Sequence, residues 1–158
     1  MKHPLHIMFH GLPGTGKTSA SHIVQEIHNV DYIVSTDAII ETECNRLGLT
    51  YNQGWANLIK QATTRMNACR NEIIANNHNF IDDHTNLTAG GRKRKLASIP
   101  KHYRNVCYVF DVPPVEWRKR LNSRPNKTIP EDVLEQMCKI TVFPTLGEGF
   151  DAIIKFVY

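Results

Sequence analysis

The sequence contains no apolar run that approaches the roughly 20 residues of a membrane-spanning helix, and no basic stretch followed by a long apolar one near its first residues. Neither a membrane span nor a signal peptide is therefore expected. Cysteines are few and far apart: Cys44, Cys69, Cys107 and Cys138 form no C-x-x-C pair. Isolated thiols are typical of a reducing compartment, so a cytoplasmic protein is predicted.

A large excess of charge of one sign is also missing. The 158 residues carry a net charge of +4 at pH 7, with 41% hydrophobic and 22% charged residues. This composition is that of a soluble globular protein, and the length suits one domain over residues 1–158. The mild positive charge is compatible with an anionic partner but does not by itself predict nucleic acid. The pattern gives no information on the oligomeric state.

Short apolar runs alternate with stretches of helical periodicity along the whole chain. We expect strands over 4–10, 31–35, 79–83, 105–112 and 152–158. We expect helices over 17–29, 37–48, 54–77, 88–98, 115–122 and 131–140. Strict alternation of strand and helix predicts an α/β fold of three layers, in which helices cover both faces of a mostly parallel sheet.

The strongest motif is "GLPGTGKT", residues 11–18, which has the P-loop spacing G-x-x-x-x-G-K-[ST] between a predicted strand and a predicted helix. Glycines let backbone N–H groups wrap around a phosphate, and the helix N-terminus adds a partial positive charge. Lys17 would reach the β- and γ-phosphates, and Thr18 would place its hydroxyl on Mg²⁺. The predicted phosphate-binding residues are Gly11, Gly14, Thr15, Gly16, Lys17, Thr18 and Ser19.

Three classes of P-loop protein compete: a kinase, a nucleotide-dependent switch, and an AAA-type or mechanical ATPase. A GTPase reads guanine with N-K-x-D, whereas residues 126–129 read "NKTI" and lack the carboxylate. An AAA-type module usually needs a longer chain with a lid domain. The length therefore favours a small kinase.

Carboxylates follow two of the predicted strands. Asp37 comes after the second strand, at the edge of the sheet that carries the P-loop, where it could accept the proton of an attacking hydroxyl. The alternative is that Asp37 only caps the following helix. Asp82 and Asp83 end the third strand, and one of them could support a magnesium site. Strand alternation turns these two side chains to opposite faces, and we favour Asp83 for that role.

A basic loop precedes the helix at 131–140. Arg124 in this loop could spread positive charge over a transferring phosphoryl group, as an arginine finger does. Arg118 and Arg120 are rivals for this role. The alternative for all three is a solvated basic surface at a helix end.

Taken together, "GLPGTGKTS", "STD", "DHTNL", "VFDVP", "SRPNKTIPEDVLEQM" and "FPTLGEGFDAI" resemble the kinase domain of the 5′-polynucleotide kinases, phage and eukaryotic. The resemblance spans nearly the whole chain and implies a P-loop kinase fold with ATP as donor and Mg²⁺ as cofactor. It implies that Asp37 is the general base on the acceptor, that Asp83 lies near Asn86, and that Arg124 is the lid arginine. It also implies action in a host cytoplasm if the protein is phage-encoded.

The departures of this chain from the family include two single positions. Phage members carry an arginine three residues after the aspartate that matches Asp37, and here that position is Ile40. Their aspartate beside "TNL" aligns with His84, so Asp83 is one residue out of register with it. Both differences concern the acceptor side of the site.

Further candidates concern the partner. Arg92 and Arg94, in "GRKRK" at 91–95, could track phosphates of DNA or RNA next to the acceptor region, although such runs are more often solvated helix surfaces. Tyr51, Trp55 and Tyr103 could stack on an unpaired base. We expect Trp55 to pack in the core instead, because it lies on the apolar stripe of its helix. His6 and His10 share a face of the first strand but lack the partners of a zinc site.

These observations predict an ATP- and Mg²⁺-dependent kinase that transfers the γ-phosphate to a hydroxyl of nucleic acid, with the 5′-hydroxyl of DNA or RNA as the leading acceptor. The alternatives are a kinase for the hydroxyl of a hydroxymethylated base in DNA, a small-metabolite or nucleoside kinase, and a nucleotide-binding module without catalysis.

Overall fold

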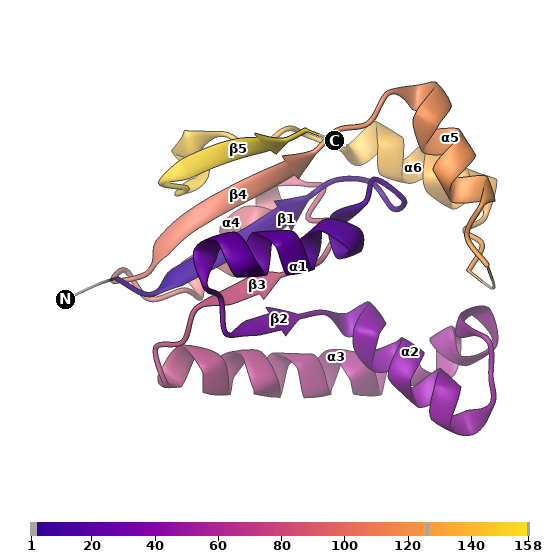
Figure 1. Ribbon diagram of the computed structural model, residues 1–158, viewed down its shortest axis with the longest axis horizontal. Helices are drawn as coiled ribbons and strands as arrows, with labels where there is room; N and C mark the ends of the chain where they lie inside the picture. The colour runs from indigo at the N-terminus through magenta and orange to yellow at the C-terminus, as the bar shows by residue number, and fades with distance from the viewer. Residues whose placement is uncertain (1–2, 126, 158) are drawn as a thin grey trace.

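The computed structural model describes residues 3–125 and 127–157, and its centre is a five-stranded sheet (Figure 1). The strands are β1 (Leu5–His10), β2 (Tyr32–Val34), β3 (Phe80–Asp82), β4 (Arg104–Phe110) and β5 (Ala152–Phe156). Their order across the sheet is β2-β3-β1-β4-β5, and every pairing is parallel. In the central strand, Ile7 lies opposite Ile81 of β3 and Val106 of β4.

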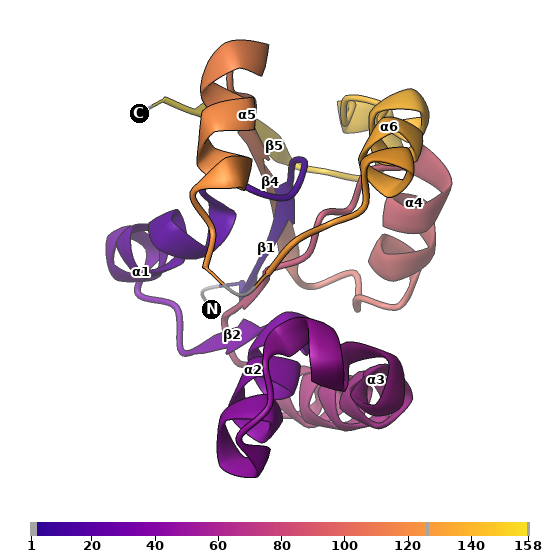
Figure 2. The same cartoon turned by 90° about the vertical axis from the view of Figure 1, so that its right-hand side faces the viewer.

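Helices surround this sheet, as the view from its carboxyl edge shows (Figure 2). They are α1 (Lys17–His28), α2 (Thr36–Leu47), α3 (Tyr51–Ala75), α4 (Ala89–Ala97), α5 (Pro114–Asn122) and α6 (Glu131–Ile140), with a 3₁₀ turn η1 (Leu146–Glu148). No helix in the described part of the chain is long and apolar enough to span a membrane.

Alternation along β1 divides the core between the two faces of the sheet. Ile7 and Phe9 pack with Ala20 and Val24 of α1. On the opposite face, Met8 packs with residues of α4, β4 and the segment before β5, and α3 covers Phe80 and β2. The predicted α/β fold with helices on both faces of a parallel sheet is therefore confirmed.

Two features of the fold differ from the sequence-based expectation. The third helix begins at Tyr51 rather than at Gly54, because Thr50 and Gln53 form a capping box that satisfies the first free amides. The turn η1 was not predicted; its capping box, formed by Thr145 and Glu148, spans a single turn. Both misses arise from capping side chains and not from hydrophobic periodicity.

The strand order determines where a ligand can bind. The chain leaves β1 toward β2 on one side, and later returns to β4 on the other side of β1. In open parallel sheets, this reversal produces a crevice at the carboxyl ends of the strands. The segment after His10 of β1, which carries the glycine motif, lies at that position.

His6 makes the stability of this core dependent on pH. Its ring is fully buried, stacks on Phe80 and contacts Asn105, while its Nε2 atom has no hydrogen-bond partner among the described residues. Burial lowers the pKa of His6 to about 4, whereas an unfolded histidine titrates near 6.5. The unfolded chain therefore takes up a proton first as the pH falls, so the stabilisation from neutral His6 is present above pH 6.5 and is lost toward pH 4.

We expect His6→Leu to flatten this dependence. A shift of this size corresponds to about 3 kcal/mol of unfolding free energy lost across the interval. Urea unfolding at several pH values between 7 and 4 measures the slope for both proteins. Equal slopes would show that His6 does not control acid stability, whatever the variant does to stability at pH 7.

Candidate functional site

The glycine motif folds into a loop that opens directly into α1. Gly16 is the N-cap of this helix, with φ at 92°, a left-handed conformation that favours glycine, and no side chain caps the first amides. A Cβ atom on Gly11 would lie 2.6 Å from the carbonyl oxygen of Phe110, so only glycine fits against β4. Trp117 of α5 fixes the loop from outside, because its indole N–H donates to the carbonyl of Pro13 at 2.7 Å. Uncapped amides at a helix start form a binding site for an anion.

Lys17 lies inside this loop. Its ammonium donates to the carbonyl oxygens of Gly11 and Leu12, both at 2.8 Å, and the side chain is buried. Burial lowers the pKa of Lys17 to about 8, while the carboxylate of Asp83 opposes that change. A buried cation whose hydrogen bonds go to neutral carbonyls gains stabilisation when a polyphosphate arrives.

Thr18 and Asp83 face each other across the loop. The Thr18 hydroxyl donates to Oδ2 of Asp83 at 3.1 Å. Burial raises the pKa of Asp83, although Lys17 and Thr18 act in the opposite direction. A hydroxyl and a carboxylate are hard oxygen donors, and Mg²⁺ typically takes one or two such protein ligands beside water and phosphate oxygens. The pair therefore fits a magnesium ion. No group of three His, Cys, Asp or Glu residues that could hold a metal occurs in the described ranges.

Asp82 points away from the P-loop, as strand alternation predicts. It is 1% exposed and accepts hydrogen bonds from His84 and from Lys95 at 3.0 and 3.1 Å. Burial raises the pKa of Asp82, but these two partners outweigh it and hold the pKa well below its usual range. The two carboxylates thus occupy different environments, and of the two it is Asp83 that contacts the P-loop, through Thr18.

Asp37 lies in the first turn of α2 but does not cap it. The N-cap is Ser35, whose hydroxyl accepts from the amide of Ala38, so the alternative that Asp37 is only a cap is wrong. Its Oδ1 atom accepts a hydrogen bond of 2.7 Å from Tyr51, and its Oδ2 atom lies 3.0 Å from the Lys127 ammonium. Partial desolvation raises the pKa of Asp37, but Lys127 and Tyr51 outweigh it and lower the pKa below its usual value.

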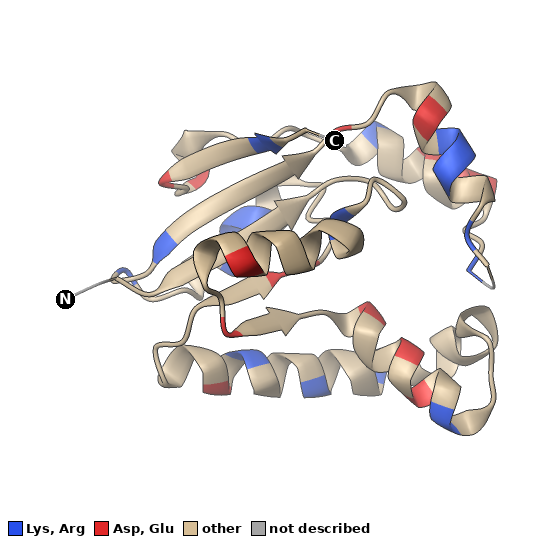
Figure 3. Cartoon of the chain, in the orientation of Figure 1, with Lys and Arg blue, Asp and Glu red and all other residues tan. Residues whose placement is uncertain are grey.

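The loop between α5 and α6 is docked on α2 and α3. Lys127 also binds Glu41 at 2.9 Å and lies 3.8 Å from the centre of the Tyr51 ring. Asn52 exchanges hydrogen bonds with Thr128, including one of 2.9 Å to its hydroxyl. Figure 3 shows acidic residues along α2 opposite the basic residues of α5 and this loop. The loop therefore reaches across the carboxyl edge of the sheet to Asp37.

The three candidate arginines have different surroundings. Arg118 pairs with Glu131 on α6, and Arg120 pairs with Glu116 one turn earlier on α5. Arg124 is half-buried, and its charge acts on Lys17, where it contributes to the lowered pKa. Of the three, Arg124 is the one whose charge is among the causes of the lowered pKa of Lys17.

Arg92 corrects the prediction of a phosphate-tracking surface. Its side chain is fully buried and forms a bidentate pair with Glu148 at 2.7 and 2.8 Å, and it also donates to the carbonyls of Asn86 and Val142. This guanidinium is not available to an acceptor. Arg94 is exposed. Its guanidinium lies next to Gly90 and Gly91 in the first turn of α4.

Asn86 forms hydrogen bonds with β1 and with Lys95 of α4. Its side-chain amide donates to the carbonyl of Phe9 at 2.7 Å, and its oxygen accepts from Lys95 at 2.8 Å. It also donates weakly to Asp82, at 3.4 Å, and not to Asp83. Asn86 therefore links β1, at Phe9, to β3, at Asp82.

The aromatic residues are distributed differently from the expectation. Trp55 is 45% exposed, so the prediction that it packs in the core is wrong. It follows Tyr51 by one helical turn, at the end of α3 that carries the Asp37 contact. Tyr103 is buried and cannot stack on a ligand. Gly54 lies against Cys44 of α2, and Leu58 packs on the cluster that contains Cys44. The side of α3 that faces α2 therefore carries Gly54 and Leu58, and Trp55 lies beside it.

Sequence reasoning missed Lys127 and His84 as partners of the site. Lys127 lies 90 residues after Asp37, and no local pattern joins them. His84 was noted only as a departure in alignment, yet it contacts both Asp82 and Thr36. The proximity of His84 to the strand-end aspartates was the one available signal.

The parallel sheet and the glycine loop between β1 and α1 define an α/β domain of the P-loop kinase type. A family model described as an AAA domain matches residues 7–142, and the chain belongs to this family. No curated protein matches the chain.

Solved structures share the fold at low sequence identity. A protein provisionally described as a kinase, from Chloroflexus aurantiacus J-10-fl, has a TM-score of 0.71 at 16% identity, covering 99% of this chain and 86% of the other. A gluconokinase from Sinorhizobium meliloti 1021 has a TM-score of 0.59 at 16% identity, covering 98% and 83%. A chain of the Pnkp1/Rnl/Hen1 RNA repair complex has a TM-score of 0.65 at 21% identity; 88% of this chain matches 44% of that one.

Proposed function

We propose that the protein is a kinase that transfers the γ-phosphate of ATP to a hydroxyl group, with the 5′-hydroxyl of DNA or RNA as the leading acceptor. The observation that carries this proposal is the grouping at one edge of the sheet: Lys17 lies inside the P-loop, Asp83 accepts from Thr18 at 3.1 Å, and the loop after α5 reaches Asp37 through Lys127 at 3.0 Å. Phosphoryl transfer requires a cation that binds the phosphates, a carboxylate that can support Mg²⁺, an arginine over the transferring group and a general base.

In this mechanism the acceptor oxygen forms a bond to the γ-phosphorus while the bond to the β-phosphate oxygen breaks. Asp37 takes the proton of the acceptor hydroxyl through Oδ2, the oxygen that now binds Lys127. Tyr51 keeps the other oxygen fixed. Lys17 and Arg124 stabilise the negative charge on the transferring group and on the leaving diphosphate. Magnesium, held through Thr18 and Asp83, would neutralise the β- and γ-phosphate oxygens.

Three points support a nucleic acid acceptor. The motifs resemble those of polynucleotide kinases, a chain of an RNA repair complex shares the fold, and the exposed Trp55 lies one turn from Tyr51. Aromatic side chains of this kind stack on unpaired bases. Against it, the gluconokinase matches 98% of this chain over 83% of its own length. A small-metabolite kinase is therefore the second candidate.

The deciding experiment is transfer of labelled γ-phosphate to a panel of acceptors: 5′-hydroxyl oligonucleotides of DNA and RNA, DNA with hydroxymethylated bases, nucleosides, and sugar acids such as gluconate. Selective labelling of an oligonucleotide end supports the proposal. Labelling confined to small molecules would replace it with the second candidate.

Salt dependence gives a separate prediction for the nucleic acid acceptor. Each phosphate contact to a single strand contributes about −0.7 to the slope of log affinity against log salt. We expect Arg94→Glu to reduce the slope by about one such contact and to raise the acceptor KM, with the KM for ATP unchanged. Arg92 is omitted from this test because it is buried.

Lys101→Glu is the matched control. It makes the same change of charge on an exposed side chain in the turn before β4, at the opposite edge of the sheet from the P-loop. If both variants alter the slope equally, the effect reflects net charge, and α4 is not a contact surface.

A further inference from the structure

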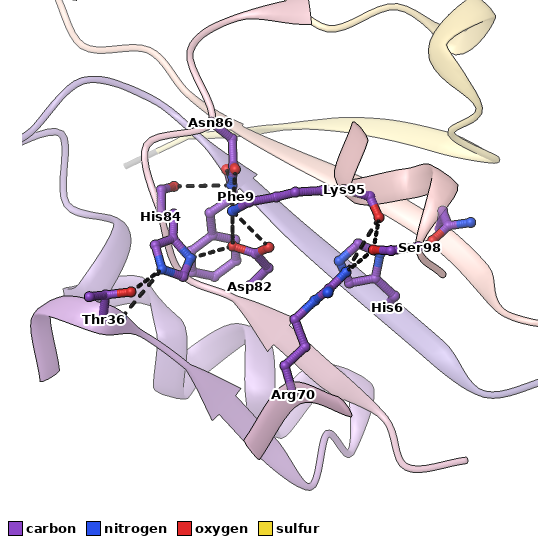
Figure 4. Close-up of polar contacts among 10 residues, drawn as sticks. His6, Phe9, Thr36, Arg70, Asp82, His84, Asn86, Lys95 and Ser98 are labelled. Carbon is purple, nitrogen blue, oxygen red and sulfur yellow. Dashed lines mark hydrogen bonds and ion pairs between the residues drawn. The ribbon is translucent and has the colours of Figure 1, made fainter. Parts of the chain in front are cut away.

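A chain of polar contacts leads from the buried Asp82 to the start of α2 (Figure 4). Asp82 is paired with Lys95 on one side and with Nδ1 of His84 on the other. On the far side of the imidazole ring, Nε2 lies 3.0 Å from the Thr36 hydroxyl and 3.3 Å from the Thr36 amide nitrogen. His84 therefore bridges a core carboxylate and the first residue of a helix.

These partners determine how the ring is protonated. Asp82 is an ionised carboxylate and can only accept, so Nδ1 carries the hydrogen that His84 donates to it. In the neutral ring Nε2 is then the acceptor, which is what the amide of Thr36 requires. A carboxylate that fixes the tautomer of a histidine also fixes the orientation of its ring.

Two side chains bind amides at the start of α2. The first amides of a helix have no partner within the helix, and Thr36 is buried. His84 accepts a hydrogen bond from the amide of Thr36, and the Ser35 hydroxyl accepts one from the amide of Ala38 at 3.2 Å. Between these two residues lies Asp37, whose carboxylate bonds to Tyr51 and Lys127.

We propose that His84, oriented by Asp82, is a positioning residue that sets the place of Asp37 relative to the P-loop. This inference rests on the proposed function, in which Asp37 takes the acceptor proton. The segment directly after β3 carries both ends of the arrangement: Asp83 accepts from Thr18 of the P-loop, and His84, the next residue, contacts Thr36 of α2. One strand end thus sets the spacing between the phosphate site and the base.

Two substitutions separate the two ends of the ring. In His84→Asn the side-chain amide lies where Nδ1 was, so it can still donate to Asp82 but cannot reach Thr36. In His84→Gln the amide oxygen lies where Nε2 was, so it can accept from Thr36. We expect the glutamine variant to keep at least half of kcat and the asparagine variant to lose about tenfold, because small misplacement of a reacting group is costly. The KM for ATP should not change in either.

A purely structural histidine gives the opposite order. If His84 only satisfies the buried carboxylate of Asp82, asparagine is the benign variant, and glutamine lowers both the melting temperature and the yield. That order, or equal kcat in both variants, would overturn the proposal. Arg70→Gln is the control: Arg70 binds the Lys95 carbonyl and Ser98 in the same region without contacting Thr36, and should lower stability with kcat retained.

Amide hydrogen exchange tests the positioning role without any activity assay, and so keeps it distinct from the proposed function. Exchange at Thr36 and Asp37, followed by NMR at one pH, should accelerate at least tenfold in His84→Asn and remain near the parent rate in His84→Gln. Parent rates in both variants would show that His84 does not hold α2. The expected exchange pattern in a protein with no transfer activity would retain His84 as the anchor of α2 and reject only the kinase reaction.

Discussion

Replacing Lys17 with alanine is expected to lower kcat for phosphoryl transfer about 10²–10³-fold, the usual scale for one preorganised electrostatic contact. Lys17 is the buried cation inside the P-loop, and its ammonium now donates to the carbonyls of Gly11 and Leu12. When ATP binds, this charge meets the β- and γ-phosphates, and alanine provides none. Steady-state kinetics with the acceptor identified by the panel measures the effect.

Lys17→Met is the matched variant, because it keeps the aliphatic stem in the loop and removes only the charge. Both variants should lose activity to a similar extent while their melting temperatures stay near the parent. Activity within twofold of the parent in either variant would reject the P-loop assignment. A large loss in alanine alone would assign the effect to loop packing.

Asp37→Asn is expected to lower kcat at least about 10²-fold with the KM for ATP little changed, which is the scale of a general base. Asparagine keeps the shape and can still accept from Tyr51, but its amide is no base. The side chain of Asp37 is 56% exposed, and exposed ion pairs contribute about 0–1 kcal/mol to stability. The melting temperature should therefore hardly move.

Glu41→Gln is the matched control for Asp37. Glu41 is the other carboxylate that binds Lys127, so this variant removes the same kind of ion pair without removing the base. We expect it to stay within a few-fold of the parent. A similar loss in both variants would assign the effect to the docking of the loop, and unchanged kcat in Asp37→Asn would remove Asp37 from the chemistry.

Local patterns in the sequence were sufficient for the strands, the helices and the P-loop. Periodicity of two and of 3.6 residues reports which side of an element is buried, and the glycine motif has a fixed backbone geometry. The opposite orientations of Asp82 and Asp83 also follow from strand alternation alone. These are properties of neighbours in the chain, so one sequence contains them.

The remainder depends on contacts between distant residues. "GRKRK" reads as four equivalent cations, but the helix turns Arg92 toward Glu148, which lies 56 residues further on, and Lys95 toward Asp82. Likewise, Lys127 meets Asp37 only because the loop after α5 crosses the carboxyl edge of the sheet. Composition cannot show which member of a charged run finds a partner, because the partner is set by packing.

The order of the strands also bears on how the protein is made. β1 is central in the sheet, yet its neighbours, β3 and β4, begin only at Phe80 and Arg104. Ribosomes add about 5–20 residues per second, so β1 waits several seconds for its second neighbour. Until then Ile7, Met8 and Phe9, all fully buried in the finished fold, lack the strand that pairs with β1 on its β4 side. Nascent chains that stop before β4 should therefore be substrates for chaperones and proteases.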